Sequence, residues 1–244
     1  IAFSKNLDEQ KEIAQVLTDT DNLIQATEQL INKKQLIKTA TMQNLLTGKI
    51  RLAEFDTKKT KPSELGEIPS DWGVIPLKEL GEFQSGSGFP VIHQGLKSGR
   101  YPFFKVSDMN NKGNEKYLLN SNNYINEDIR AIISAKTVKK HSIVFAKIGA
   151  AIFLERKKLT VTESLIDNNM MSFLPNELFN HEYAQLCFLN FKLGNLVEAT
   201  ALPSLSGKDI GEILIAKPTL KEQIAIAQIF SDMDKELTAL NQRL

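Results

Sequence analysis

The 244-residue chain is poor in the residues that carry most enzyme and metal chemistry. It has one cysteine, Cys187, and its three histidines, His93, His141 and His181, show no metal-ligand spacing. A single cysteine excludes an internal disulfide framework, and no phosphate-binding glycine-rich loop is present. No apolar run approaches the roughly 18 residues of a membrane span, and no signal peptide is recognisable. The sequence therefore predicts no catalytic residue, no metal, no cofactor and a cytoplasmic location.

The overall charge balance conceals an asymmetry along the chain. The formal net charge is only +1. Residues 97–158, however, hold 13 Lys/Arg against 5 Asp/Glu, a net of +8, whereas residues 159–217 hold 3 against 7, a net of −4. A basic block in a nearly neutral protein is typical of a surface that binds a polyanion. The alternative is a solvated basic face with no partner.

The end of the chain repeats its beginning. Residues 7–17 read Leu-Asp-Glu-Gln-Lys-Glu-Ile-Ala-Gln-Val-Leu, and residues 220–230 read Leu-Lys-Glu-Gln-Ile-Ala-Ile-Ala-Gln-Ile-Phe. A constant offset of 213 aligns them, and it also places Asp19 and Asp21 on Asp232 and Asp234. A repeat indicates one supersecondary unit that is used twice. We therefore expect two related helices on either side of a different middle domain.

The first helix is expected from about Leu7 to Thr47, with Asn6 as its N-cap and Gly48 as its stop. Some forty residues at about 1.5 Å each give a rod of roughly 60 Å. Its apolar residues fall into two columns with a spacing of seven, which is typical of a supercoiled seam. The columns are Val16, Leu23, Leu30, Ile37 and Leu17, Ile24, Ile31.

The last helix opens with Thr219 as cap and Glu222 three residues on, a capping-box arrangement. Its apolar stripe alternates spacings of four and three. We expect the two helices to pair antiparallel, the alternative being two independent amphipathic helices packed on the domain. The residues predicted to pair are Ile13, Leu17, Ile24, Ile31, Ile226, Phe230, Met233, Leu237 and Leu240.

The sequence predicts an α+β fold, in which a mixed α/β domain is combined with two long antiparallel coiled-coil helices. The expected divisions are the first helix at 1–55, a polar linker at 56–64, the domain at 65–217 and the second helix at 218–244. Expected strands lie at 103–106, 142–145, 171–173 and 212–216, and expected helices at 127–134 and 181–196.

Several segments resemble one known family. Residues 66–72 (Gly-Glu-Ile-Pro-Ser-Asp-Trp), 77–80 (Leu-Lys-Glu-Leu) and 85–88 (Ser-Gly-Ser-Gly) resemble the opening of a target recognition domain. Residues 202–206, 213–215 and 220–223 resemble its end and the helix that follows, and residues 45–51 (Leu-Leu-Thr-Gly-Lys-Ile-Arg) resemble the close of the conserved spacer. The family is the specificity (S) subunit of Type I restriction–modification enzymes, and the resemblance covers essentially the whole chain.

The resemblance implies a non-catalytic subunit that reads one half of a bipartite target in double-stranded DNA. The family alternates two recognition domains with two helical regions, whereas this chain has helix, domain, helix. Residues 1–3 (Ile-Ala-Phe) resemble a strand end before such a helix, so we expect the second half of a longer subunit or a natural half subunit. The implied partners are modification (methyltransferase) subunits and restriction subunits, and two copies could also pair as a homodimer.

We expect the DNA contacts to come from loops, with cations on phosphates and small polar groups on base edges. The candidates are Ser85, Gly86, Ser87, Arg100, Lys105, Ser107, Asp108, Asn110, Asn111, Lys112, Lys136, Lys139, Lys140, Lys147, Ser206 and Lys208. For Ser85–Ser87 the alternative is an ordinary surface loop, and for residues 105–112 it is a turn capped by Asp and Asn. Residues 156–158 are interpreted as a solvated turn, and Trp72 as a core residue.

Two other functions fit less well. One is a coiled-coil adaptor with a protein-binding middle domain, which the basic block argues against. The other is an S-like subunit of a related restriction system with a fused nuclease–methyltransferase, which the sequence leaves open. A nuclease would need more than Asp108 with a following Glu-Arg-Lys run at 155–157, a pattern that arises easily by chance.

Overall fold

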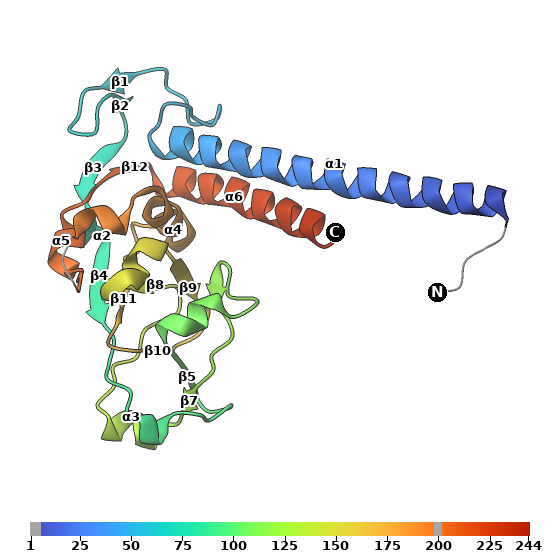
Figure 1. The fold of residues 1–244 in the computed structure, drawn as a ribbon. Helices are drawn as coiled ribbons and strands as arrows, with labels where there is room; N and C mark the ends of the chain where they lie inside the picture. Colours follow the sequence, from blue (N-terminus) through green and yellow to red (C-terminus); the bar gives the residue numbers. More distant parts are fainter. Residues whose placement is uncertain (1–5, 198–201) are drawn as a thin grey trace. The chain divides into compact units, whose positions relative to one another are not determined.

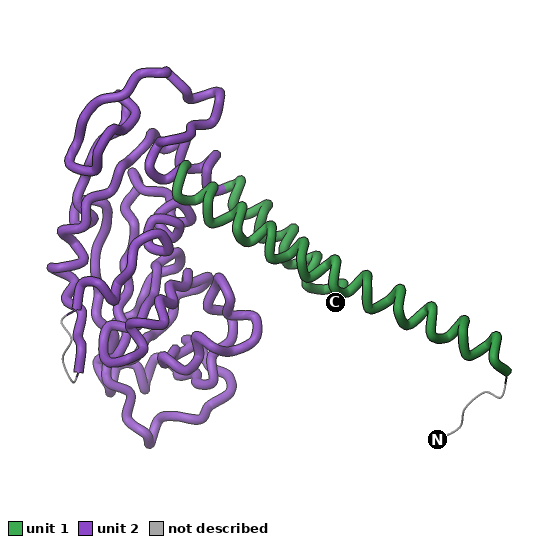
Figure 2. Tube along the Cα trace, turned by 45° about the horizontal axis from the view of Figure 1, so that its top comes forward, with its two compact units in different colours: residues 1–44, 228–244 green, residues 45–227 purple. Residues whose placement is uncertain are grey.

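The computed structural model describes residues 6–197 and 202–244, so the strand end expected at residues 1–3 lies outside the described residues. The chain divides into two compact units (Figure 2). The helical unit contains residues up to 44 together with 228–244, and the domain unit contains residues 45–227. No helix within the described ranges has the length and apolar character needed to cross a membrane.

The helical unit is built on α1 (Leu7–Leu46) and α6 (Leu220–Asn241). Asn6 caps α1, because its Oδ1 accepts a hydrogen bond from the Asp8 N–H at 3.0 Å. The two helices run antiparallel (Figure 1), with an ion pair from Lys34 to Glu236 at 2.7 Å. A second ion pair joins Lys38 to Asp234, and three apolar side chains, Ile31, Leu237 and Leu240, form a buried cluster.

The pairing is shorter than the sequence predicted. Ile13, Leu17 and Ile24 are 49%, 60% and 41% exposed, so they make no buried seam in this structure. The reason is length, since α6 has 22 residues and α1 has 40. Met233 is half-buried, while Ile226 and Phe230 are each only 1% exposed.

A five-stranded sheet forms the centre of the domain unit, in the order β4-β11-β8-β9-β6. All four residues of β8 are buried, which fits a central strand. The pairs β4–β11, β11–β8 and β8–β9 are antiparallel, whereas β6 lies parallel to β9. The strands are β4 (Gly81–Ser85), β6 (Tyr117–Leu118), β8 (Ile143–Ala146), β9 (Lys157–Thr160) and β11 (Met170–Pro175).

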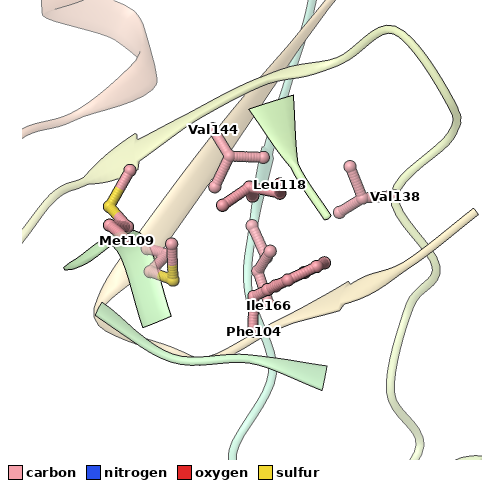
Figure 3. Packing of buried hydrophobic residues seen from close by; sticks show 7 residues of the cluster. Phe104, Met109, Leu118, Val138, Val144 and Ile166 are labelled. Carbon is pink, nitrogen blue, oxygen red and sulfur yellow. The ribbon is translucent and has the colours of Figure 1, made fainter. Parts of the chain in front are cut away.

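The two faces of this sheet are covered by different parts of the domain. On one face, Phe145 and Phe173 pack against Phe188 of α4 (His181–Asn190), with ring centroids 5.7 and 5.2 Å apart. On the other face, Val144 belongs to a buried cluster with Phe104, Met109, Leu118, Val138, Ile166 and Met170 (Figure 3). Neighbouring residues of a strand point to opposite faces, so Val144 and Phe145 each anchor one layer.

Smaller elements complete the domain. The short sheets are β1 (Thr60–Lys61) with β2 (Ile68–Pro69), β3 (Gly73–Pro76) with β12 (Leu214–Lys217), and β5 (Tyr101–Phe104) between β7 (Tyr124–Ile125) and β10 (Leu165–Ile166). The short helices are α2 (Leu77–Leu80), α3 (Glu127–Ile132) and α5 (Gly207–Gly211). The 3-10 turns are η1 (Val91–His93), η2 (Val106–Asn110), η3 (Gly149–Leu154) and η4 (Leu193–Leu196).

Two expectations of secondary structure were wrong in detail. The helix expected at 181–196 ends at Asn190, because Phe191 turns to an extended conformation before η4. The segment expected to be a polar linker contains β1, in which Thr60 and Lys61 pair with Pro69 and Ile68. The predicted α+β class, a mixed domain combined with two helices, is confirmed, although the last helix is shorter than the first.

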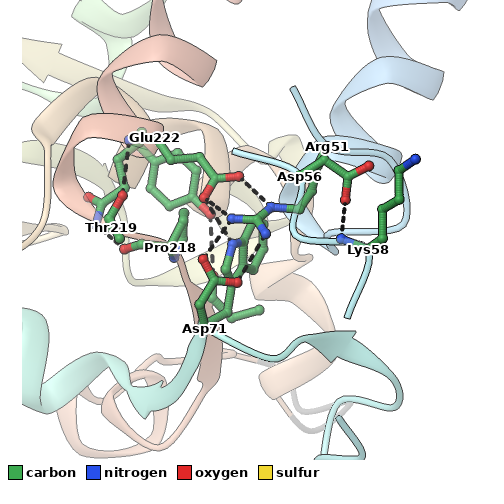
Figure 4. A network of polar contacts seen from close by, with 11 residues as sticks. Arg51, Asp56, Lys58, Asp71, Pro218, Thr219 and Glu222 are labelled. Atoms are coloured by element: carbon green, nitrogen blue, oxygen red, sulfur yellow. Dashed lines mark hydrogen bonds and ion pairs between the residues drawn. The ribbon is translucent and has the colours of Figure 1, made fainter. Parts of the chain in front are cut away.

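A buried ion network joins three segments of the domain unit (Figure 4). Arg51 donates to the Glu222 carboxylate from Nε at 2.9 Å and from Nη2 at 2.7 Å. The same guanidinium binds Asp71 through two bonds of 3.0 and 2.9 Å, and the Trp72 indole N–H donates to Glu222 at 3.0 Å. The hydrogen bond to Glu222 is the main cause of a raised Arg51 pKa. Trp72 is buried, as expected of a core residue.

Candidate nucleic-acid interface

The loop that follows β4 is held by backbone hydrogen bonds to residues 166–170 of the same domain. The Gly86 N–H donates to the Met170 carbonyl at 3.0 Å, and the Ser87 N–H to the Ile166 carbonyl at 2.9 Å. A Cβ at Gly86 would lie only 1.9 Å from the Asp167 carbonyl oxygen. The glycine therefore serves a close approach to the Asp167 backbone.

Two of the predicted lysines meet this loop. Lys147 Nζ donates to Ser85 Oγ at 3.0 Å, and the Lys136 N–H donates to Ser87 Oγ at 3.2 Å. The side chain of Gln84 strengthens the junction by donating to the Thr137 carbonyl at 3.1 Å. Residues that are far apart in the sequence thus form one surface, which we call the loop cluster: Ser85, Gly86, Ser87, Lys136, Lys147 and Asn168.

Asn168 was missed by the sequence reasoning. It is exposed in the turn between β10 and β11, next to Asp167, which forms a bridge with Ser87. The Asp167 carboxyl has a raised pKa because it is buried. An Asp-Asn-Asn run between two strand-like stretches was the signal that could have identified this turn.

Ser206 and Lys208 lie beside the loop cluster. The Leu205 N–H donates to the Lys147 carbonyl at 2.8 Å, which places the following residues next to Lys147. Ser206 is the N-cap of α5, since its Oγ accepts from the N–H groups of Lys208 and Asp209 at 3.1 and 3.2 Å. Its hydroxyl oxygen thus has a structural role, while the Lys208 side chain is exposed.

The second predicted group, residues 105–112, divides into structural and exposed members. Asp108 is fully buried, and its carboxylate accepts from the Lys105 N–H at 2.8 Å and from Asn122 Nδ2 at 2.5 Å. Asn111 Nδ2 donates to the Asn120 carbonyl at 3.0 Å. The prediction that Asp108 reads a base was therefore wrong for this structure, because both of its carboxylate oxygens already accept hydrogen bonds within the domain. Asn111, which is half-buried, is similarly used within the turn.

The remaining members of this segment differ in what holds them. Ser107, Asn110 and Lys112 are exposed on η2 and just beyond it. Lys105 Nζ donates to Gln94 Oε1 at 3.1 Å. Arg100 lies 3.8 Å from the Glu127 carboxylate, with its guanidinium 5.0 Å from the centroid of the Tyr101 ring.

The basic segment does not gather at one point of the domain. Lys139 and Lys140 are exposed before β8, whereas Lys147 follows it. A four-residue strand spans about 13 Å, and this length of β8 lies between the lysine pair and Lys147. The Lys139 carbonyl accepts from Thr160 Oγ1 at 2.8 Å, and this bond fixes the backbone of the turn while leaving the lysine side chain exposed.

One part of the basic segment is buried. Lys157 is 3% exposed within β9, and its Nζ donates to Glu155 at 2.5 Å and to the Phe191 carbonyl at 2.8 Å. Burial lowers the pKa of Lys157. The interpretation of residues 156–158 as a solvated turn was wrong, and the count of +8 overstates the exposed positive charge.

The described residues show neither an accessible cysteine nor a metal cluster. Burial raises the pKa of the Cys187 thiol to about 12, so the thiolate form is suppressed at neutral pH. No group of three His, Cys, Asp or Glu side chains in the described part of the chain could hold a metal ion.

The family model described as "Type I restriction modification DNA specificity domain" matches residues 69–244. The chain belongs to this family. The match confirms the expected class, that of a DNA specificity domain. This chain is 29% identical over 250 residues to the Type I restriction enzyme MjaVIII specificity subunit of Methanocaldococcus jannaschii, covering 93% of this chain and 54% of that protein.

Two solved structures share the fold of this chain. The HsdS subunit of Thermoanaerobacter tengcongensis matches with a TM-score of 0.66 and 13% identity, over 96% of this chain and 51% of the other. A structure concerned with complex assembly and conformational transition of the type I R-M system matches with a TM-score of 0.58 and 14% identity, over 94% and 53%. The chain thus spans about half the length of the proteins it matches.

Proposed function

We propose that this chain reads one half of a bipartite DNA target as the non-catalytic recognition part of a Type I restriction–modification complex. The observation that carries this proposal is the match of residues 69–244 to a DNA specificity domain. The loop cluster supports it, because hydroxyl and amide groups are presented there beside Lys136 and Lys147. Such a combination suits base edges flanked by phosphates.

The proposed roles follow from side-chain chemistry, and the residues concerned are exposed except for Ser87, Lys105 and Lys147, which are half-buried. The lysines Lys112, Lys136, Lys139, Lys140, Lys147 and Lys208 contact phosphates, because an ammonium group carries charge but little sequence information. Ser85, Ser87, Ser107, Asn110 and Asn168 are the candidates for base edges, since their side chains donate and accept hydrogen bonds. Arg100 and Lys105 act at the margin, because each already has a polar partner.

The helical unit is proposed to hold the partner subunits. Modification subunits, which would carry the methyl-transfer chemistry and its cofactor, bind along the helices, and restriction subunits join that assembly in the cytoplasm. The exposed apolar stripe of α1 supports an association role, since Leu17 and Leu23 are 60% and 68% exposed. The similarity to a structure described for type I R-M complex assembly supports the same role.

The stripe also suits self-pairing of two copies, which would read an interrupted palindrome through a two-fold axis. Sedimentation velocity at micromolar concentration tests this arrangement. A dimer that dissociates when Leu23 is changed to Glu supports pairing through the stripe. A strictly monomeric chain contradicts it and leaves DNA reading untouched.

The decisive experiment is a methylation map made with the cognate modification subunit. A single split motif that changes when the domain unit is exchanged for another recognition domain is the expected result. DNA binding should also weaken steeply as salt rises, because several counterions are released. A protein-binding adaptor would bind no DNA at low salt, and that outcome would overturn the proposal.

A further inference from the structure

The loop between β4 and β5 carries the two most exposed large apolar side chains of the described residues. Val91 and Ile92 are 83% and 85% exposed, and no other large apolar side chain among those residues exceeds 72%. Single exposed apolar residues are ordinary in proteins, but two neighbours with so little cover form a patch of their own. We call Val91 and Ile92, which lie on η1, the apolar tip.

The apolar tip is held from both sides. Before it, the Phe89 ring stacks on the buried Phe103 ring with centroids 3.8 Å apart. After it, Gln94 Nε2 donates to the Phe89 carbonyl at 2.8 Å, and Gln94 Oε1 accepts from Lys105 Nζ at 3.1 Å. Valine and isoleucine side chains are also stiff at χ1, because both are branched at Cβ. The tip therefore presents a preformed apolar shape, and its exposure does not come from a loose loop.

The apolar tip lies close to the loop cluster along the chain. Val91 follows Ser87 by four residues, and four residues span at most about 14 Å. Neighbouring base pairs of a duplex are about 3.4 Å apart along its axis. A duplex that meets Ser87 thus brings base steps within about four base pairs of that contact into the reach of the tip.

The charges around the apolar tip favour a polyanion over a protein partner. Residues 83–107 contain three basic residues, Lys97, Arg100 and Lys105, and no Asp or Glu. The Glu127 carboxylate lies near Arg100 but also accepts from Arg130 at 2.8 Å, so its charge is balanced. An apolar pocket on a protein would need no acid-free surroundings. A duplex does, because phosphates line both edges of its grooves.

We propose that the apolar tip is a wedge that enters between two neighbouring base pairs of the target duplex and partly unstacks them. Aliphatic side chains of this size open base steps in other DNA-binding proteins and kink the duplex there. The free energy of opening depends on the step, so the tip would favour flexible pyrimidine–purine steps. It would thereby select sequence at a position that the loop cluster does not contact. The inference rests on the proposed function, since the wedge acts on the DNA that the domain unit reads.

The double variant Val91→Ala with Ile92→Ala tests the wedge in the complex with the cognate modification subunit. The probes are duplexes of the mapped target, each with 2-aminopurine at one position of the half-site or its flanks other than the methylated adenine. This base emits more strongly when it is unstacked. Binding of the unmodified complex should raise the emission at one step at least about twofold, and the double variant should abolish that rise.

Two further variants provide the matched comparison. Leu178→Ala removes an apolar side chain that is 63% exposed, beyond the end of β11 that pairs with Gly81 and away from the end that pairs with Ser85. It should leave the emission rise intact. Val91→Leu with Ile92→Leu keeps the apolar volume and should retain the rise. If the double alanine variant does not fold, the single variant Ile92→Ala takes its place, and it should at least halve the rise.

A mismatch at the responding step gives an independent measurement. An unpaired base is easier to unstack, so the mismatch should tighten binding of the unmodified complex about fivefold. The double alanine variant should gain nothing from it. Equal gains in both proteins would overturn the wedge.

The remaining outcomes separate the wedge from its alternatives. Bound DNA with the same emission in the unmodified and double alanine complexes overturns the wedge alone. A double alanine variant that folds but does not assemble with the modification subunit makes the tip a protein contact, which also overturns it. Uracil in place of a thymine that weakens binding as much as the variant, with no emission rise, makes the tip a methyl contact instead. Failure of the unmodified complex to bind DNA at low salt overturns the proposed function, and the wedge with it.

Discussion

The loop cluster and the η2 turn contain similar residue types but use them differently. In the loop cluster, the Ser85 hydroxyl accepts from Lys147 Nζ and the Ser87 hydroxyl from the Lys136 backbone N–H, while Asn168 remains exposed. In the η2 turn, Asp108 is fully buried and Asn111 binds backbone of the same domain. A polar side chain in a loop is therefore a poor guide to DNA contact until its hydrogen bonds have been counted.

The largest expected effect is on stability, and it should differ between alanine substitutions at two glycines of the same loop. Gly86→Ala places a Cβ 1.9 Å from the Asp167 carbonyl oxygen, whereas a Cβ at Gly88 meets no atom within 4 Å. We expect Gly86→Ala to destabilise the fold by about 2–4 kcal/mol and Gly88→Ala to change it by about 0.5 kcal/mol or less. Urea denaturation measures both, and equal stabilities would contradict a pinned loop.

Asp108 and Asn110 test the η2 turn in the same way. Asp108→Ala removes an acceptor of three hydrogen bonds and should cost about 2–3 kcal/mol of unfolding free energy, because donors around a buried site lose their partner. Asn110→Ala, at an exposed position, should leave stability nearly unchanged. If Asn110 reads a base edge, however, this variant will alter the preferred target sequence in a methylation map. An unaltered target would remove Asn110 from the interface.

The lysines of the loop cluster should affect DNA affinity without affecting the fold. Lys136→Glu with Lys147→Glu should weaken binding to all sequences about equally and reduce the salt slope by about 2. Lys33→Glu is the control, because it makes the same charge change at an exposed site in the helical unit. Fluorescence anisotropy at several salt concentrations gives both quantities. Unchanged affinity at low salt would exclude the loop cluster from DNA contact.

The smallest expected effect concerns the other end of β8. The His141 and His181 rings stack with centroids 3.8 Å apart, and burial lowers the pKa of each. Lys140 and Lys116 oppose their protonation, while Glu182 favours it. A lowered pKa means that the unfolded chain binds protons more readily, so stability should fall as the pH drops below about 6.5.

The histidine variant His141→Phe should reduce this acid sensitivity. The loss of melting temperature between pH 7.5 and 5.5 should shrink by a few degrees relative to the unchanged chain. A loss of the same size in both proteins would show that the stacked pair does not set the acid response. Changing the half-buried His93, which lies outside the stacked pair, in the same way is the control.

The contacts between residues that are far apart in the chain, such as those of the loop cluster, could not be predicted from the sequence. Helix α1 was predictable because its N-cap, its apolar residues at a spacing of seven and the glycine after its last turn are all local signals. The loop cluster depends instead on strand pairing, since Ser87 meets Asp167 across 80 residues. The burial of Lys157 was equally hidden, because it requires both Glu155 and the carbonyl of Phe191. The capping-box reading of Glu222 recognised the helix start but not its bond to Arg51.

Trp72 is the only tryptophan of the chain, and its indole N–H donates to Glu222 at 3.0 Å. Indole fluorescence responds to a nearby charge and to water, so the emission of this protein reports on one place, the seating of the first turn of α6. Release of that turn should change the emission before the central sheet unfolds. The chain thus carries its own optical probe for the attachment of its last helix.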